Sequence, residues 1–252
     1  MPSSKSNMVG SPSAHTNKKE PRRNIENLTD RVTEDLRNSI MSAEYQLGEA
    51  LSEIRLAEKY GVSRTPVRDA LTELQRQGLI VIRPQSGSFV FMPTEEDVAE
   101  LCEFRRMLEV AAIRLAHARR PQETIAQLWV GVETMTQSLE TDNRLDYAAA
   151  DSAFHQAAVE NCANRYLIEA YKLVSGRLDT IRSHNLTDWH KLRNKMTSEH
   201  RNIAVAFEKD NLMKVEEILD RHISRMISTF RIARRKVEYE KANLKTAGKE
   251  AK

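Results

Sequence analysis

The sequence predicts a mainly α-helical protein: an N-terminal winged helix-turn-helix with a small β-hairpin wing, followed by an all-α antiparallel helical bundle. Three observations support this fold class. The 252-residue chain is 30% charged and only 6% aromatic, with 8 glycines and 7 prolines, a composition typical of helices rather than of turn-rich β-sandwiches. Apolar residues recur at helical spacing over most of the chain. One short segment, around residues 80–91, instead alternates as β-strands do.

Helical periodicity begins near Leu28. Residues 1–26 are rich in Ser, Asn, Lys and Pro and show no apolar periodicity, which predicts a disordered tail. Val32, Leu36 and Ile40 then continue from Leu28 at intervals of four. This spacing predicts the first helix.

Two short helices are predicted next, separated by a tight turn. Ser52 and Ser63 stand where each helix would begin, and Gly61 and Gly78 where each would end. Pro66 falls in the first turn of the second helix, where a missing N–H has no cost. We expect this second helix to be the recognition helix.

The alternating segment predicts a hairpin. Ile80 and Ile82 precede a turn at residues 84–87, and Phe89 and Phe91 follow it. The order helix, helix, tight turn, helix, hairpin over residues 27–92 is that of a winged helix-turn-helix DNA-binding domain.

The predicted recognition helix turns polar residues away from its apolar face. An arginine fork there can bind guanine in the major groove, and a helix N-terminus can bind phosphate. A small polar wing tip can approach the minor groove or the DNA backbone. The alternative is that the arginines are only solvated. The predicted contacts to double-stranded operator DNA are Ser63, Arg64, Thr65, Arg68, Thr72, Gln85, Ser86 and Gly87.

The remainder predicts an effector-binding domain at residues 93–237. Thr94 and Asp97 have the spacing of a capping box. Short connections between long amphipathic helices predict an antiparallel bundle. A basic C-terminal tail is expected at 238–252. The six predicted helices cover about 95–119, 121–140, 143–162, 165–185, 188–208 and 211–237.

Four possible metal ligands lie on apolar faces of three of these helices: Asp151, His155, His200 and His222. Asp151 and His155 are four apart, so they share one helix face. One carboxylate and three imidazoles suit a divalent ion such as zinc, nickel or manganese. The alternatives are core histidines and a surface Asp–His pair. The other histidines, expected at the surface or in loops, are His15, His117, His184 and His190.

Arg105 shares a face with Leu101, Leu108 and Ala112, so we expect it to point inward. A buried arginine needs an anionic partner. That partner is either a protein carboxylate or the carboxylate of an effector held in a bidentate fork. Arg106 is expected to be exposed.

Long stretches of the chain resemble a known family. The motifs are Leu51-Ser52-Glu53, Leu56-Ala57-Glu58, Val62 to Leu71, Gly78-Leu79 and Gly87 to Val90. They resemble the GntR family of bacterial transcription regulators over about residues 28–92. Phe104 to Glu109 and Asp151 to His155 resemble the FCD ligand-binding domain of the FadR subfamily.

The resemblance implies a homodimer that binds a pseudo-palindromic operator and responds to a small organic acid. It implies that Arg64 and Arg68 contact bases, that Thr65 supports them, and that residues 85–87 reach the minor groove. It also implies a metal held by the Asp and three His, and favours an effector carboxylate on Arg105. Ile54 stands where some members carry a DNA-contacting arginine, so operator sequence does not transfer.

Composition excludes other classes. No apolar run reaches the roughly 18 residues of a membrane span, and the N-terminus has no apolar core segment, so we expect neither a membrane span nor a secretory signal. Two cysteines fit a reduced cytosol. We therefore expect a cytoplasmic, ligand-responsive regulator, most simply a repressor. Two alternatives stay open: a metal-dependent enzyme, although no spare carboxylate or histidine is evident on the inward faces, and an architectural DNA-binding protein without an effector.

Overall fold

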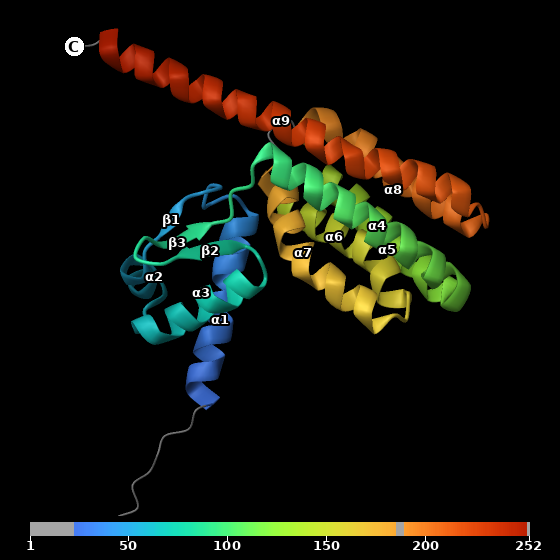
Figure 1. The fold of residues 1–252 in the computed structure, drawn as a ribbon, viewed down its shortest axis with the longest axis horizontal. Coiled ribbons are helices and arrows are strands. Elements are labelled where there is room, and N and C mark those ends of the chain that lie inside the picture. Colours follow the sequence, from blue (N-terminus) through green and yellow to red (C-terminus); the bar gives the residue numbers. More distant parts are fainter. Residues whose placement is uncertain (1–22, 185–188, 251–252) are drawn as a thin grey trace, which may run out of the picture.

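The computed structural model describes residues 23–184 and 189–250 (Figure 1). Its helices and short strands follow the predicted order. A smaller N-terminal unit lies beside one end of a helical bundle (Figure 1). The elements are α1 (Arg23–Met41), β1 (Ala50–Leu51), α2 (Glu53–Tyr60), α3 (Arg64–Arg76), β2 (Ile80–Arg83), β3 (Gly87–Val90), α4 (Glu95–Arg119), α5 (Pro121–Glu140), α6 (Arg144–Asn161), α7 (Arg165–His184), α8 (Trp189–Glu208) and α9 (Leu212–Glu250).

The N-terminal unit is built on a core of its own. Helices α1 and α3 pack together, and their apolar faces meet at fully buried positions that include Val32, Leu36 and Val67. The predicted caps of α2 are confirmed: Ser52 accepts a hydrogen bond from the backbone of Arg55, and Gly61 adopts a left-handed conformation. The winged helix-turn-helix predicted from the sequence is therefore present. Residues 1–22 of the predicted disordered tail lie outside the described residues, and the prediction was wrong for residues 23–26, which form the start of α1.

The wing is part of a three-stranded antiparallel sheet in the order β1-β3-β2. The predicted hairpin pairs Ile80 with Val90 and Ile82 with Ser88. Val90 therefore shares the core-facing side with Ile80, and Phe89 lies on the opposite side, where Arg83 covers its ring. Apolar alternation located both strands, but it did not show which residues of the second strand face the core, because that depends on the length of the turn. The sequence analysis also missed β1, which has only two residues.

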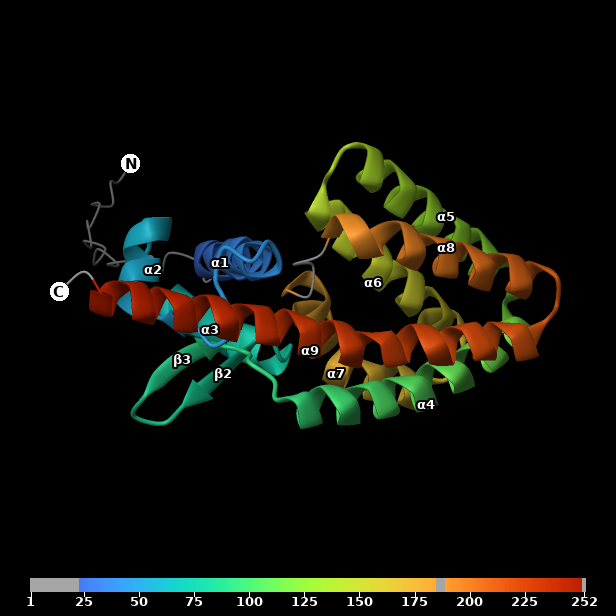
Figure 2. The same cartoon turned by 90° about the horizontal axis from the view of Figure 1, so that it is seen from above.

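The bundle contains the six predicted helices, with starts within a residue or two of expectation. Helix α5 packs mainly on α6, while α4 contacts α6 and α9 (Figure 2). Thr94 and Asp97 form the predicted capping box at the start of α4. Asn164 accepts hydrogen bonds from two backbone N–H groups at the start of α7, as expected. Asp188, the expected cap of α8, lies outside the described residues.

Helix α9 extends beyond the end of the bundle (Figure 1). Its backbone stays helical to Glu250, so the basic segment predicted as a separate tail continues the last helix. The sequence there is rich in Lys, Glu and Ala and has no proline, which favours continued helix. Among the described residues, no helix is long and apolar enough to cross a membrane.

Helix α7 makes several contacts between the two units. A Cβ atom on Gly176 would lie 1.5 Å from the carbonyl oxygen of Gln77, so this position on α7 has room only for glycine. Nearby, the guanidinium of Arg177 lies over the ring of Phe91. At the end of α7, Nε2 of His184 lies 3.0 Å from the carbonyl oxygen of Tyr45. His184 is therefore a domain-contact residue, and its expected placement as a mere surface or loop histidine was wrong.

Candidate metal centre and DNA-contacting surface

The four predicted metal ligands come together inside the bundle. Asp151 and His155 lie on α6, His200 on α8 and His222 on α9, and all four are buried. One ligand atom from each lies within 4.8 Å of the others. They meet because each occupies the inward face of its helix, as the apolar spacing around it predicts.

Each histidine is oriented by a hydrogen bond on Nδ1. Nδ1 of His155 lies 2.9 Å from a carboxylate oxygen of Glu109. Nδ1 of His200 lies 2.8 Å from the carbonyl oxygen of Met196, and Nδ1 of His222 lies 3.1 Å from a carboxylate oxygen of Glu199. All three partners are acceptors, so Nδ1–H donates in every ring, and these tautomers are assigned from the partners. The other nitrogen, Nε2, therefore carries a lone pair. Histidine ligands in metal sites are commonly held in this way.

The inward-facing atoms have no donor among them. Nε2 of His200 lies 3.2 Å from Nε2 of His155 and 3.2 Å from Oδ1 of Asp151. With its proton on Nδ1, His200 cannot donate to either atom, and Oδ1 of Asp151 has no hydrogen-bond partner. Buried lone pairs that face one another are unfavourable unless a cation lies among them. The residues thus fit a divalent metal.

Burial and neighbouring charges keep Asp151, His155 and His222 in the protonation states that a metal needs. Burial lowers the pKa of His222 to about 4. Burial, together with the charges of Arg105 and Arg182, holds the pKa of His155 well below its usual range. Burial alone would raise the pKa of Asp151, but the positive charge of Arg182 holds it well below its usual range. Neutral imidazoles and an ionised carboxylate are the forms that coordinate metals.

Two buried arginines flank the centre. Arg105 is only 2% exposed, as its helix face predicts, and its Nε donates to Glu109 at 2.6 Å. Of the two partners that the sequence left open, the structure thus shows a protein carboxylate. Arg182, which was not predicted, forms an ion pair with Asp151, in which Nε lies 3.0 Å from Oδ2. Nη2 of each arginine is buried without a hydrogen-bond partner, so each guanidinium retains an unused donor.

The expectation that the inward faces hold no spare carboxylate was wrong. Glu109 and Glu199 are both buried beside the histidines. Glu109 also accepts a hydrogen bond from the hydroxyl of Tyr171 at 3.0 Å, and Glu199 also binds Arg225. Charged residues are almost never fully buried unless they are paired, so the sequence analysis did not count these two glutamates among the inward-facing residues. Glu109 follows Arg105 by one helical turn, and this spacing is the signal that could have identified it.

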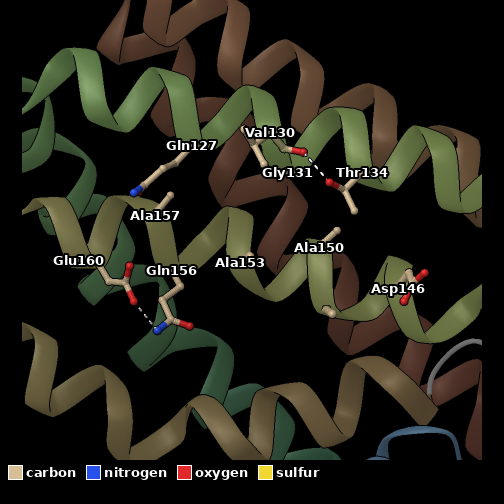
Figure 3. Close-up of a pocket in the computed structure, with 11 residues that line it drawn as sticks. Gln127, Val130, Gly131, Thr134, Asp146, Ala150, Ala153, Gln156, Ala157 and Glu160 are labelled. Atoms are coloured by element: carbon tan, nitrogen blue, oxygen red, sulfur yellow. Dashed lines mark hydrogen bonds between the residues drawn. The ribbon is translucent and has the colours of Figure 1, made fainter.

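Little space remains next to the centre. A cavity of about 10 Å³ touches Glu109, Phe154 and His155, enough for about one water molecule. A larger groove of about 490 Å³ lies between α5 and α6 (Figure 3). It is lined by small residues such as Gly131 and Ala153, and none of the four metal-cluster residues lines it. An organic ligand at the centre therefore requires side chains to move.

His117, like His184, has partners of its own outside the metal cluster. Nε2 of His117 lies 2.6 Å from Asp210, and its ring packs edge-on against Phe207. Arg106 is exposed as expected and pairs with Asp220. The side chains of His15 and His190 lie outside the described residues.

The predicted DNA-contacting residues are all exposed. Arg64, Thr65, Arg68 and Thr72 lie on α3, and residues 85–87 form the tip of the wing. Both arginines donate hydrogen bonds to one carboxylate, that of Glu53 at the start of α2. The exposed face of α3 and the wing tip thus present the surface that the sequence predicts for DNA.

Two hydroxyl groups on this surface differ in their availability. Ser63 occupies the N-cap position of α3, but its side chain makes no capping hydrogen bond, which differs from the expected cap. Its hydroxyl is therefore able to donate a hydrogen bond to a DNA phosphate. The hydroxyl of Thr72 donates to the carbonyl oxygen of Arg68 at 2.9 Å, which leaves its methyl group as the outward contact.

Comparison with known proteins agrees with both units. Residues 28–90 match the family model described as bacterial regulatory proteins, gntR family, and residues 100–225 match that of the FCD domain. The chain is 36% identical over 127 residues to an HTH-type transcriptional regulator of Agrobacterium vitis, covering 49% of this chain and 74% of that protein. It is 26% identical to the HTH-type transcriptional repressor RspR of Escherichia coli, covering 78% and 86%.

A solved structure agrees with the fold. A GntR transcriptional regulator from Rhodococcus sp. RHA1 superposes with a TM-score of 0.70 at 22% identity, covering 80% of this chain and 96% of that one. Regulators of this family bind double-stranded DNA through the winged helix-turn-helix. The chain therefore belongs to the GntR family of bacterial regulatory proteins, carries an FCD domain, and is a transcription regulator rather than an enzyme.

Proposed function

We propose that this protein is a cytoplasmic homodimeric repressor whose operator binding is controlled by a small carboxylate at a metal site in the FCD domain. Its two recognition helices would enter successive major grooves about 34 Å apart. The similarity to the repressor RspR supports repression rather than activation of transcription. The metal ligands proposed are Asp151, His155, His200 and His222.

The observation that carries this proposal is the convergence of lone pairs. Three rings are locked with Nδ1–H turned outward, and Asp151 adds an oxygen that has no hydrogen-bond partner. A divalent ion held there would supply a Lewis-acidic centre that can bind a carboxylate or hydroxyl oxygen. The same ligand set suits zinc, nickel or manganese.

The buried arginines supply the second half of the proposed effector site. Arg105 and Arg182 each retain a buried Nη2 group without a partner. An effector carboxylate can bind such a donor strongly, because charge-assisted hydrogen bonds are roughly twice as strong as neutral ones. A carboxylate on the free Nη2 of Arg105 would leave the bond between Nε and Glu109 in place, and Glu109 would link the effector to His155, which it also holds.

Two routes link this site to the DNA-binding unit. The first is the linker at residues 92–97, which leads into α4 and Arg105. The second is α7. Arg182 touches the metal ligand Asp151, and on the same helix Gly176 and His184 touch the winged helix-turn-helix. Movement of Arg182 would thus displace the helix on which the DNA-binding unit rests. Coupling between sites is typically worth about 1–3 kcal/mol.

The test is DNA binding by metal-loaded protein. The probe is a duplex that the wild-type protein enriches from a random library, and citrate, malate and lactate are titrated against acetate as the non-chelating control. We expect a chelating acid to change the affinity about 5- to 150-fold, and His200→Ala to abolish that response. Equal responses in the wild type and His200→Ala would contradict the proposed site.

The route through α7 has its own test in Gly176→Ala. Its Cβ would meet the Gln77 carbonyl oxygen at 1.5 Å, so the domain contact must open. We expect metal to be retained and the response to carboxylate to be reduced. Leu173→Ala is the matched control, because Leu173 lies on the same helix and is 69% exposed. An unchanged response in Gly176→Ala would leave the linker as the route.

A further inference from the structure

Glu53 joins the two arginines of the recognition helix. It is the first residue of α2, directly after the N-cap Ser52. A single oxygen, Oε2, accepts hydrogen bonds from Nη2 of Arg64 at 2.6 Å, Nε of Arg64 at 3.2 Å and Nε of Arg68 at 2.8 Å. These charge-assisted bonds fix the direction of both guanidinium groups while the side chains remain solvent-accessible.

The arrangement leaves a recognition fork free. Arg68 binds Glu53 through Nε, and its two terminal nitrogens take part in no hydrogen bond among the described residues. The two N–H groups of such a fork match O6 and N7 of guanine. A guanine can therefore be bound without breaking the bond between Arg68 and Glu53. If Arg64 or Arg68 binds a DNA phosphate instead, the phosphate lies close to the Glu53 carboxylate, and the two negative charges repel each other.

Glu53 carries its charge at neutral pH. The hydrogen bond from Arg64 is the largest influence on its carboxyl group and lowers its pKa, and Arg68 adds to the effect. The side chain is 29% exposed and the two arginines are 53% and 58% exposed. The bonds are therefore in place in free protein and are weak enough to rearrange on DNA.

We propose that Glu53 is a positioning and specificity-determining residue that directs Arg64 and Arg68 toward base edges and disfavours their capture by phosphates. The gain in sequence specificity has two physical sources. The guanidinium groups are ordered before DNA arrives, which reduces the entropy lost on binding. The carboxylate also repels phosphate, which weakens the sequence-independent part of the affinity. This inference rests on the proposed DNA contacts of the two arginines.

The experiment compares Glu53→Gln with Glu58→Gln. Both changes remove one negative charge from α2, but Glu58 is exposed and makes no side-chain hydrogen bond or ion pair among the described residues. Affinity is measured for the duplex enriched by the wild-type protein and for a scrambled duplex of the same length. We expect Glu53→Gln to bind scrambled DNA more tightly and to lose about tenfold in the ratio of the two affinities. Glu58→Gln should shift both affinities by the same factor.

Arg68→Ala separates this inference from the proposed function. If Glu53 acts through Arg68, Glu53→Gln should change the ratio much less in the Arg68→Ala background than in the wild type. A ratio that stays unchanged in Glu53→Gln would overturn the inference while Arg68→Ala can still confirm the base contact. Losing both affinities together with a lowered Tm would also overturn it, since that marks a structural role. A wild-type protein that enriches no sequence would contradict the proposed function itself.

Discussion

Glutamates hold arginines in both functional regions, and the two arrangements differ in burial. In the bundle, the side chains of Arg105 and Glu109 are 2% and 3% exposed. On the recognition helix, the side chains of Arg64 and Arg68 are more than half exposed and share the partly exposed Glu53. Burial makes the first pair costly to break, because a lone buried charge has no water to solvate it. Exposure keeps the second group reversible. The same pair of residue types thus builds a fixed scaffold in one region and an adjustable contact in the other.

The largest expected effect comes from breaking the buried pair. Glu109→Ala removes the partner of Arg105, His155 and Tyr171 at once. We expect it to lower the free energy of unfolding by about 3–5 kcal/mol, because it leaves an uncompensated buried charge. Urea denaturation measures this, with Glu103→Ala, an exposed position on α4, as the control. A loss equal to that of the control would show that the buried pair is not a scaffold.

Metal should reinforce the same region. A ligand that binds only the folded protein stabilises it by about 2.7 kcal/mol at a free concentration 100 times its Kd. We expect zinc, nickel or manganese to raise the Tm of the wild type and a chelator to reverse the gain. His222→Ala should not respond. A metal-induced shift of the same size in His222→Ala would place the binding elsewhere.

The exposed arginines should matter for sequence recognition rather than for folding. We expect Arg68→Ala to cost about 1–3 kcal/mol in discrimination at one base position. The measurement is binding to the enriched duplex and to its single-base variants. Arg76→Ala, on the same helix and exposed near its C-terminus, is the control. Unchanged affinity and unchanged base preference in Arg68→Ala would remove it from the DNA contacts.

Removing the exposed carboxylate of Glu53 should change stability much less than removing the buried one. Glu53→Ala removes the carboxylate from its exposed arginines, as Glu109→Ala does in the core. Exposed ion pairs are typically worth about 0–1 kcal/mol, so we expect the free energy of unfolding to change by no more than about 1 kcal/mol. Urea denaturation beside Glu109→Ala gives the direct contrast. A loss of several kcal/mol would mean that the recognition surface is also part of the scaffold.

Sequence patterns predicted the helices, the hairpin and the inward placement of the four candidate metal ligands. The reason is that periodicity states which face of a helix is buried, and His155, His200 and His222 all lie on such faces. The phase of β3 was not predictable, because a shift of one residue places Phe89 instead of Val90 toward the core, and only the turn decides between them.

The residues that orient the ligands were not predictable in the same way. Glu199 and Arg182 are charged residue types, which usually indicate a solvated surface, and their burial depends on partners from other helices. The contact between Gly176 and Gln77 joins the two units through residues that are about a hundred positions apart in the sequence. No local pattern carries such information, because it arises only when the units pack together.

The most direct test of this account is the metal content of protein purified without a histidine tag, for the wild type and for His155→Ala combined with His200→Ala. We expect about one divalent ion per chain in the wild type, which corresponds to the one four-residue cluster found among the described residues, and none in the double variant. A wild type that remains free of metal after zinc, nickel and manganese have each been supplied would contradict it.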